Sequence, residues 1–416
     1  MNVLIKSATV IDTSSKFHNQ IVDVLIEKGK ISQIAKSIKN TSNYKEIELE
    51  NLHISQGWFD SSVCFGEPGF EDRETIENGL KTAAKSGFTS IALQANTNPI
   101  IDTCSDVAFL LSKAQSQTVD LLPIGALTKN SESVDLAELF DMKNAGAVAF
   151  SDYKKPITNP NLLKIALQYA SNFEGLVCSF PLEQKIAGKG MVNEHVSSTL
   201  LGLKGSPNLA ESLQVARDLF ILEYAGGKLH IPTISTKESV KLIREAKQKK
   251  LDVTCSVAIH NFFLTDDVLN EFDTRYKVNP PLRTQEDVEA LIEGVKDGTI
   301  DMVTSDHNPQ TIEEKKVEFD HASYGTIGLE SAFGALNQIF STKKAIQLLT
   351  KGKERFGAIA SSIEEGEIAN ITLFDPNTKY EFNKSDILSK SKNSAFLGQE
   401  LKGKVYGIYA NKKLVL

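Results

Sequence analysis

The sequence predicts a (β/α)8 barrel of the TIM type with a small β domain built from both ends of the chain. Strand-length apolar runs alternate with amphipathic helical segments between residues 57 and 304, as expected for βα units around a parallel sheet. Both chain ends show β patterning instead. The 416 residues suit one large barrel plus a minor domain. We therefore expect a β-sandwich made of residues 1–55 and 364–416, and a barrel spanning residues 56–363.

The β domain is predicted from alternation and turn signals. Val3–Ile11 alternates apolar and polar residues, and Val22–Ala35 has a hairpin signal at Glu27-Lys28-Gly29-Lys30. From about Glu364 the pattern returns to β, in Glu367–Phe374, Lys402–Tyr409 and Lys412–Leu416. β segments that flank a barrel on both sides indicate that the two termini meet in one small β-sandwich.

Eight strands are expected in the barrel. They are Gly57–Val63, Thr89–Gln94, Asp120–Gly125, Ala147–Phe150, Leu176–Phe180, Lys228–Ile234, Asp252–Ile259 and Ile300–Thr304. Helices are expected between most of them, including Glu74–Ser86, Leu209–Tyr224, Lys237–Lys249 and Glu286–Asp297. Glycine lies just beyond three of these helices, where it stops a helix at no Cβ penalty. Eight such units define a (β/α)8 barrel.

Composition restricts the partners and the compartment. Hydrophobic residues make up 41% and charged residues 24%, which is ordinary for a globular protein. The net charge of -7 gives no electrostatic reason to expect nucleic acid or an acidic membrane as a partner. No apolar run approaches the roughly 20 residues of a membrane span, and Met1–Lys6 lacks a signal-peptide pattern. The four scattered cysteines form no CxxC pair, so we expect reduced thiols and a cytoplasmic protein.

The active site of such a barrel lies at the carboxyl ends of the strands, so the polar segments there are the candidates for function. These segments are Asp60–Gly69 after the first strand, Gln94–Pro99 after the second, Phe150–Asp152 after the fourth, and then Val278–Arg283, Thr304–Gln310 and Tyr324–Glu330.

Together these segments resemble those of dihydroorotases of the multifunctional-complex type, within the amidohydrolase superfamily. The resemblance rests on Phe65–Glu71, Asn96–Pro99, Asn279–Arg283 and the Asp306-His307 pair, and it extends from Gly57 to the C-terminal segments. It implies a barrel of the amidohydrolase type. It also implies hydrolysis of a ring amide by water bound to one or two zinc ions, whose charge lowers the pKa of that water to about 7.

The resemblance also implies a metal-ligand set that this chain largely lacks. Ser62 and Cys64 stand at the family's His-x-His after the first strand. Phe180 and Thr233 stand where histidines follow the fifth and sixth strands. None of the seven histidines of the chain lies at a ligand position. We therefore expect no cofactor.

Two carboxylates of that ligand set remain, Asp152 and Asp306. Asp306 corresponds to the proton shuttle of the family, or it is a structural residue that bonds backbone groups. Asp152, with no metal to bridge, is expected to be a hydrogen-bonded loop carboxylate. Zinc stays possible only at an atypical site formed by Cys64 with the two aspartates, because a thiolate is a good zinc ligand. The alternative is that Cys64 is a small buried thiol.

The expected substrate-binding set is altered as well. Gly66 stands where the family has an arginine that clamps the substrate carboxylate, and glycine cannot replace that charge-assisted pair. Gln310 replaces a second histidine. Asn96 and Asn279 remain and, by resemblance, would contact the substrate ring, with Gly325 completing the set.

Three functions follow from this mixture of retained loops and lost ligands. The chain is expected to be an inactive dihydroorotase-like protein of pyrimidine biosynthesis that serves as an assembly partner of aspartate carbamoyltransferase, as the resemblance implies. One alternative is an active cyclic amidohydrolase that hydrolyses dihydroorotate at an atypical site. A second is a module that binds a pyrimidine precursor through Asn96 and Asn279. The family resemblance also implies a homodimer.

Overall fold

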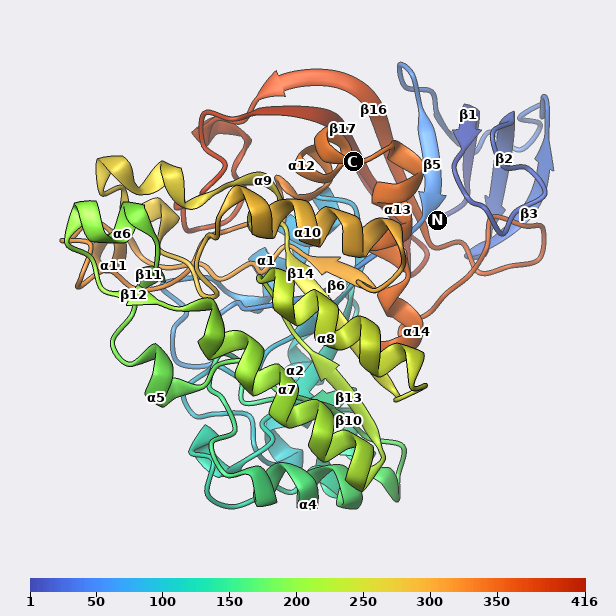
Figure 1. Ribbon diagram of the computed structural model, residues 1–416. Helices are drawn as coiled ribbons and strands as arrows, with labels where there is room; N and C mark the ends of the chain where they lie inside the picture. The colour runs from blue at the N-terminus through green and yellow to red at the C-terminus, as the bar shows by residue number, and fades with distance from the viewer.

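The computed structural model describes all 416 residues, and it confirms the predicted fold class (Figure 1). Eight parallel strands follow one another around the barrel in chain order. They are β6 (Trp58–Val63), β7 (Phe88–Leu93), β8 (Asp120–Gly125), β9 (Ala149–Phe150), β10 (Leu176–Cys178), β13 (Lys228–Ile231), β14 (Val253–Ala258) and β15 (Met302–Thr304). The barrel nearly closes where the Cys64 N–H donates to the His307 carbonyl at 2.8 Å.

The barrel strands form because their side chains are buried on both faces. Every residue of β6 and of β7 is buried, without the alternation of a half-exposed strand. Helices of the βα units cover the outside, and side chains cap their starts. The side chain of Thr75 accepts from the Asn78 N–H ahead of α1 (Ile76–Lys85), and Thr103 forms a capping box ahead of α2 (Cys104–Lys113).

The remaining long helices are α4 (Pro160–Ser171), α7 (Asn208–Ala225), α8 (Lys237–Gln248), α10 (Gln285–Lys296), α12 (Ala332–Ile339) and α13 (Thr342–Thr350). Among them, α7, α8 and α10 match their predicted ranges to within about two residues. Shorter helices are α3 (Leu139–Ala145), α5 (Gln184–Ala187), α6 (Val196–Leu201), α9 (His260–Phe263), α11 (Ile312–Lys315), α14 (Gly352–Phe356) and the 3-10 turns η1 (Lys129–Ser131), η2 (Asp266–Glu271), η3 (Thr274–Tyr276) and η4 (Lys384–Asp386). None of the helices has both the length and the apolar character needed to cross a lipid bilayer.

Several barrel strands end earlier than predicted. β10 stops at Cys178 and β13 at Ile231, so Phe180 and Thr233 lie in loops at the mouth and not on strands. Thr233 has φ 49°, a left-handed conformation that ends the extended backbone. Between these two strands lies a small parallel pair, β11 (Val192–Asn193) with β12 (Gly205–Ser206).

The chain ends form one second sheet, which appears in blue and red beside the barrel in Figure 1. Its order is β18-β17-β16-β5-β1-β2-β3, with β4 (Lys45–Ile47) paired to β1. The strands are β1 (Val3–Val10), β2 (Ile21–Glu27), β3 (Lys30–Ala35), β5 (His53–Gln56), β16 (Ile371–Glu381), β17 (Glu400–Ala410) and β18 (Lys413–Val415). Hydrogen bonding links all of them into one continuous sheet, because β16 from the C-terminal segment pairs with β5 from the N-terminal one.

An aromatic cluster joins the two sheets. Trp58 of β6 is fully buried, and its ring lies 4.7 Å from that of Phe333 and 5.6 Å from that of Phe374 on β16, centroid to centroid. Large aromatic side chains contribute most of the buried apolar area at such contacts. The second sheet is therefore packed against the start of the barrel, and the mouth at the opposite strand ends is free to hold a site.

Candidate functional site

The centre of the barrel mouth holds a buried ion pair. The Lys154 Nζ lies 2.6 Å from Asp306 Oδ2, and the two side chains are 11% and 2% exposed. Asp306 follows β15 in a left-handed conformation (φ 50°), and its N–H donates to Thr304 Oγ1 at 3.0 Å. The ring of His260 lies against the same carboxylate, with Nε2 4.0 Å from Oδ2. Burial raises the pKa of the Asp306 carboxyl, and the Lys154 ammonium counteracts that rise.

Cys64 and Tyr153 lie beside this pair. Burial raises the pKa of the Cys64 thiol to about 12; Tyr153, Asp306 and Lys154 are the neighbours that modulate it. Burial also raises the pKa of the Tyr153 phenol well above its ordinary value. Both groups therefore stay protonated and neutral at pH 7. Asn96 also neighbours the thiol, and its buried Oδ1 has no hydrogen-bond partner.

Asp152 has a different environment from the one expected for a metal ligand. Its Oδ1 accepts from the Thr128 N–H at 2.9 Å, and its Oδ2 accepts from the Thr128 hydroxyl. Both oxygens are thus bonded within the loop that follows β8. The next two residues, Tyr153 and Lys154, are the ones that reach the neighbourhood of Asp306.

The other positions expected from the ligand set are buried and separately bonded. Ser62 Oγ accepts from Gln94 Nε2 at 3.2 Å, and the Thr233 N–H donates to Ser256 Oγ at 3.2 Å. Phe180 is buried and offers no ligand atom. Nowhere in the chain do three His, Cys, Asp or Glu side chains gather in an arrangement that could hold a metal ion.

Among the substrate-binding candidates, the two glycines are required by the backbone conformation, whereas Gln310 and Asn279 can act through their side chains. A Cβ at Gly66 (φ 94°) would lie 2.6 Å from the Phe70 carbonyl oxygen, so this backbone accepts only glycine there. Gly325 (φ 146°) is similarly restricted by the Asn308 carbonyl oxygen at 2.6 Å. Gln310 donates to Asn308 Oδ1 at 3.1 Å. Asn279 is half-buried.

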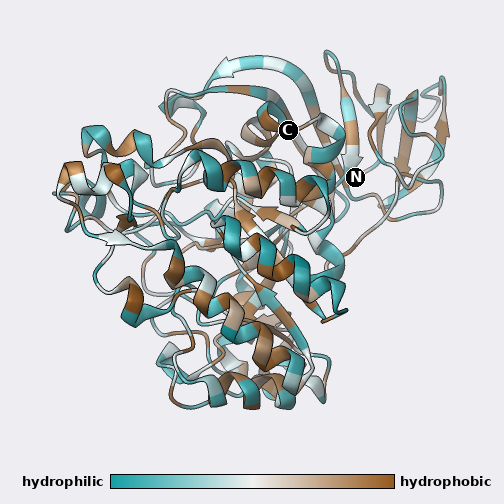
Figure 2. Ribbon diagram, in the orientation of Figure 1, coloured by the Kyte–Doolittle hydropathy of each residue, from teal (hydrophilic) through white to brown (hydrophobic).

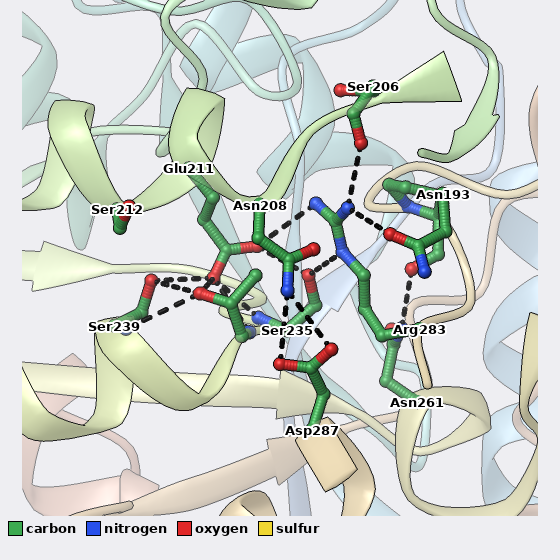
Figure 3. A network of polar contacts seen from close by, with 12 residues as sticks. Asn193, Ser206, Asn208, Glu211, Ser212, Ser235, Ser239, Asn261, Arg283 and Asp287 are labelled. Atoms are coloured by element: carbon green, nitrogen blue, oxygen red, sulfur yellow. Dashed lines mark hydrogen bonds and ion pairs between the residues drawn. The ribbon is translucent and has the colours of Figure 1, made fainter. Parts of the chain in front are cut away.

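A buried polar network holds the mouth loops in place (Figure 3). The Arg283 guanidinium donates to Ser235 Oγ at 3.0 Å, to Asn193 Oδ1 at 2.9 Å and to the Ser206 carbonyl at 3.0 Å. The Glu211 carboxylate of α7 accepts from the Ser235 N–H at 2.8 Å. Arg283 ends the Asn279–Arg283 motif, and Ser235 lies two residues beyond Thr233. The network therefore fixes the loop of Thr233 by protein contacts alone.

The barrel fold of the chain is shared with proteins of known structure. The chain is similar in structure to L-hydantoinase (dihydropyrimidinase) from Arthrobacter aurescens, with a TM-score of 0.84 and 21% identity over 100% of this chain and 97% of the other. It is also similar to dihydropyrimidinase from Brevibacillus agri NCHU1002, with a TM-score of 0.82 and 20% identity over 100% and 95%. These likenesses show that the chain shares the fold of these proteins over its whole length.

Comparison with known sequences identifies the family of the chain. The model of the "Dihydro-orotase-like" family matches residues 53–239. Dihydroorotase from Thermoanaerobacter sp. (strain X514) is 40% identical over 412 residues, covering 97% of this chain and 95% of the relative. Dihydroorotase from Acetivibrio thermocellus is 40% identical over 422 residues, covering 100% and 99%. The chain belongs to the dihydroorotase family.

The sequence-based prediction missed Tyr153 and Lys154. The available signal was their position, immediately after Asp152 at the end of the fourth strand. That prediction considered the metal-ligand and substrate-binding positions implied by the family resemblance, and Lys154 corresponds to neither.

We predict that Lys154→Met destabilises the fold, because it leaves the Asp306 carboxylate buried without a counter-charge. Loss of one partner of a buried pair costs about 3 kcal/mol or more. Urea unfolding measures this change, and Lys155→Met, at an exposed neighbouring lysine, is the matched control. The double variant Lys154→Met/Asp306→Asn should recover part of the loss. A Lys154→Met protein as stable as the wild type would show that the pair is not buried.

Acid should also destabilise the fold through three buried histidines. Burial lowers the pKa of His230 and His260 to about 3 and that of His307 to about 4. In the unfolded chain they titrate near about 6.5, so the unfolded state binds more protons below that pH. The free energy of unfolding should fall as pH drops from about 6.5 toward 5.

Urea unfolding across this pH range measures the effect. His260→Asn should give a shallower pH dependence, while His321→Asn, at an exposed position, should keep the wild-type slope. A pH-independent free energy of unfolding in this window would contradict the burial of neutral histidines.

Proposed function

We propose that this member of the dihydroorotase family binds no zinc and does not hydrolyse dihydroorotate. The observation that supports this most strongly is the Lys154 ammonium 2.6 Å from Asp306 Oδ2, at the carboxylate that corresponds to a family ligand. A dication on the same carboxylate would be repelled by that ammonium at short range in a site of low dielectric. The protonated Cys64 thiol adds to the mismatch, because zinc binds the thiolate.

The substrate side supports the same proposal. The position of the carboxylate clamp is Gly66, and an arginine there would bring its Cβ against the Phe70 carbonyl oxygen. An active enzyme would need another cation to hold the substrate carboxylate. Lys154 at the centre of the mouth is engaged by Asp306, and Arg283 in the mouth loops is engaged by Ser235 and Asn193. The alternative of an active amidohydrolase therefore lacks support both at the metal position and at the anchor.

We further propose an assembly role, as a structural partner of aspartate carbamoyltransferase. Two features support it. The mouth loops are held by the network around Arg283, which requires no metal. The outer side of α7 exposes Leu209 (56%), Leu213 (44%), Phe220 (70%) and Tyr224 (78%). Their spacing of four and seven residues puts them on one face, and Figure 2 shows hydrophobic segments along this helix. Exposed apolar faces of this kind are typical of protein contacts.

A second candidate function is binding of a pyrimidine precursor without turnover. The specific observation in its favour is the buried Oδ1 of Asn96, which has no partner within the protein and is free to accept from a ligand. Asn279 is half-buried and available as well.

Metal content and turnover test the first proposal together. We expect the chain purified without chelator to hold well under one zinc ion per molecule by mass spectrometry of metals. We also expect no ring opening of dihydroorotate above the uncatalysed rate, with or without added zinc. The dihydroorotase of Acetivibrio thermocellus, handled in parallel, is the positive control. One bound zinc per chain together with turnover would refute the proposal.

Co-elution with aspartate carbamoyltransferase from the same source tests the assembly role. We expect a stable complex in size-exclusion chromatography, and we expect Phe220→Ser/Tyr224→Ser to weaken it without lowering the melting temperature. Val134→Ser and Ile368→Ser, which alter exposed apolar residues elsewhere, are matched controls. If the α7 variant disrupts only self-association of the chain, this face is a homodimer contact. Absence of any complex would contradict the assembly role.

A further inference from the structure

A second concave site lies outside the barrel mouth, where η3, α11 and the segment 384–397 meet. It is a cavity of about 540 Å³, which is the size of a small-molecule site. Six basic side chains line it against two carboxylates, those of Asp72 and Glu313, and burial lowers the pKa of one of the six, Lys315, to about 7. The basic residues are Arg275, Lys315, Lys316, Lys384, Lys390 and Lys392. Only two lining residues, Ile312 and Leu397, are hydrophobic.

The lysines of this cavity are not paired with carboxylates of the protein. Arg275 pairs with Asp273 at 2.6 Å, but the five lysines form no ion pair with any carboxylate of the chain. The nearby ion pair of Arg73 with Glu314 involves neither of the lining carboxylates. The chain as a whole has a net charge of -7, so this cluster of unpaired cations is a positive region on a negatively charged protein.

The contacts of these lysines leave donors available. Lys390 Nζ donates to the Glu71 carbonyl at 2.7 Å, and Lys392 Nζ donates to the carbonyls of Ile387 and Ser389, both at 2.8 Å. Carbonyl oxygens hold an ammonium group in place without cancelling its charge. Since each ammonium has three donors, both groups keep at least one N–H free.

Lys316 and Lys384 are exposed and make no hydrogen bond through their side chains within the protein, so all of their donors are free. Buried Lys315 differs, because its Nζ donates to three carbonyls, those of Lys277, Ser323 and Gly325. It forms a rigid part of the cavity wall, and the four exposed lysines supply the free donors.

We propose that this cavity binds a small, multiply charged anion that carries phosphoryl or carboxylate groups. Convergent unpaired cations in a concavity focus the positive potential and raise the local concentration of anions. Phosphoryl and carboxylate oxygens accept the charge-assisted hydrogen bonds that the free ammonium donors offer. The scarcity of apolar lining makes a polar ligand fit better than a hydrophobic one.

The cavity shares a wall with the barrel mouth. Gln310 and Asn393 line it, and Asn393 Nδ2 donates to the Gly325 carbonyl at 2.9 Å. Anion binding would therefore contact the same loops that carry the substrate-binding candidates. The proposal does not depend on whether the mouth binds zinc, because no candidate metal ligand lines the cavity.

Isothermal titration calorimetry of the full chain with inorganic pyrophosphate, and separately with citrate, tests this proposal. We expect at least one of them to bind with a Kd of about 0.1 mM or tighter at low salt. Binding should weaken by roughly tenfold as NaCl rises from about 50 to about 300 mM, because the exposed charges are screened. Pyrophosphate binding alone indicates a phosphoryl site, and citrate binding alone indicates a carboxylate site.

The decisive variant is Lys316→Gln/Lys384→Gln, which removes two charges but no hydrogen bond within the protein. We expect it to weaken anion binding about tenfold or more, with an unchanged melting temperature. Lys30→Gln/Lys250→Gln removes two charges at exposed positions outside the cavity and should change Kd less than about twofold. No binding of either anion, or equal weakening by both double variants, would overturn the proposal.

Discussion

The buried pair of Lys154 and Asp306 is the interaction on which the character of the barrel mouth depends. A carboxylate that is 2% exposed needs a positive partner, and in the dihydroorotase family zinc is the expected one at the corresponding aspartate. Here an ammonium group 2.6 Å away supplies the charge. Because the lysine comes from the loop after the fourth strand, it ties two sides of the mouth together across the barrel axis.

The other groups at the mouth are compatible with a buried ion pair between Lys154 and Asp306. Cys64 and Tyr153 surround the pair with neutral, protonated groups, as their raised pKa values indicate. Buried neutral histidines add no second cation beside Lys154, because the low pKa of His260 keeps its ring uncharged at pH 7. The loops keep their places through the Arg283 network, so contacts within the protein hold the architecture of the mouth.

Much of this structure could be predicted from the sequence, because hydrophobic periodicity determines the elements. The strand β8 matches its predicted range, Asp120–Gly125, and the helices match theirs closely. The ends of β10 and β13 were wrong by two or three residues, because an apolar run continues into a loop that is buried under the mouth. Periodicity reports burial, and burial alone does not distinguish a strand from a loop packed in the core.

The site was harder to predict for a related reason. Cys64 and Asp306 were expected at the mouth, and they are neighbours there. The bonding of Asp152 to Thr128 depends on the path of another loop, which no spacing in the sequence encodes. The contact of Lys154 with Asp306 depends on the conformation of the long lysine side chain, which the sequence does not specify. The continuity of the second sheet depends on the pairing of β5 with β16, more than 300 residues apart, which strand patterns alone do not specify.

The most direct test of the account is a crystal structure of the chain soaked with zinc, with anomalous diffraction recorded at the zinc absorption edge. The account predicts no anomalous peak at the barrel mouth and the Lys154 ammonium in contact with Asp306. A peak coordinated by Cys64 and Asp306, with the Lys154 side chain displaced, would contradict it.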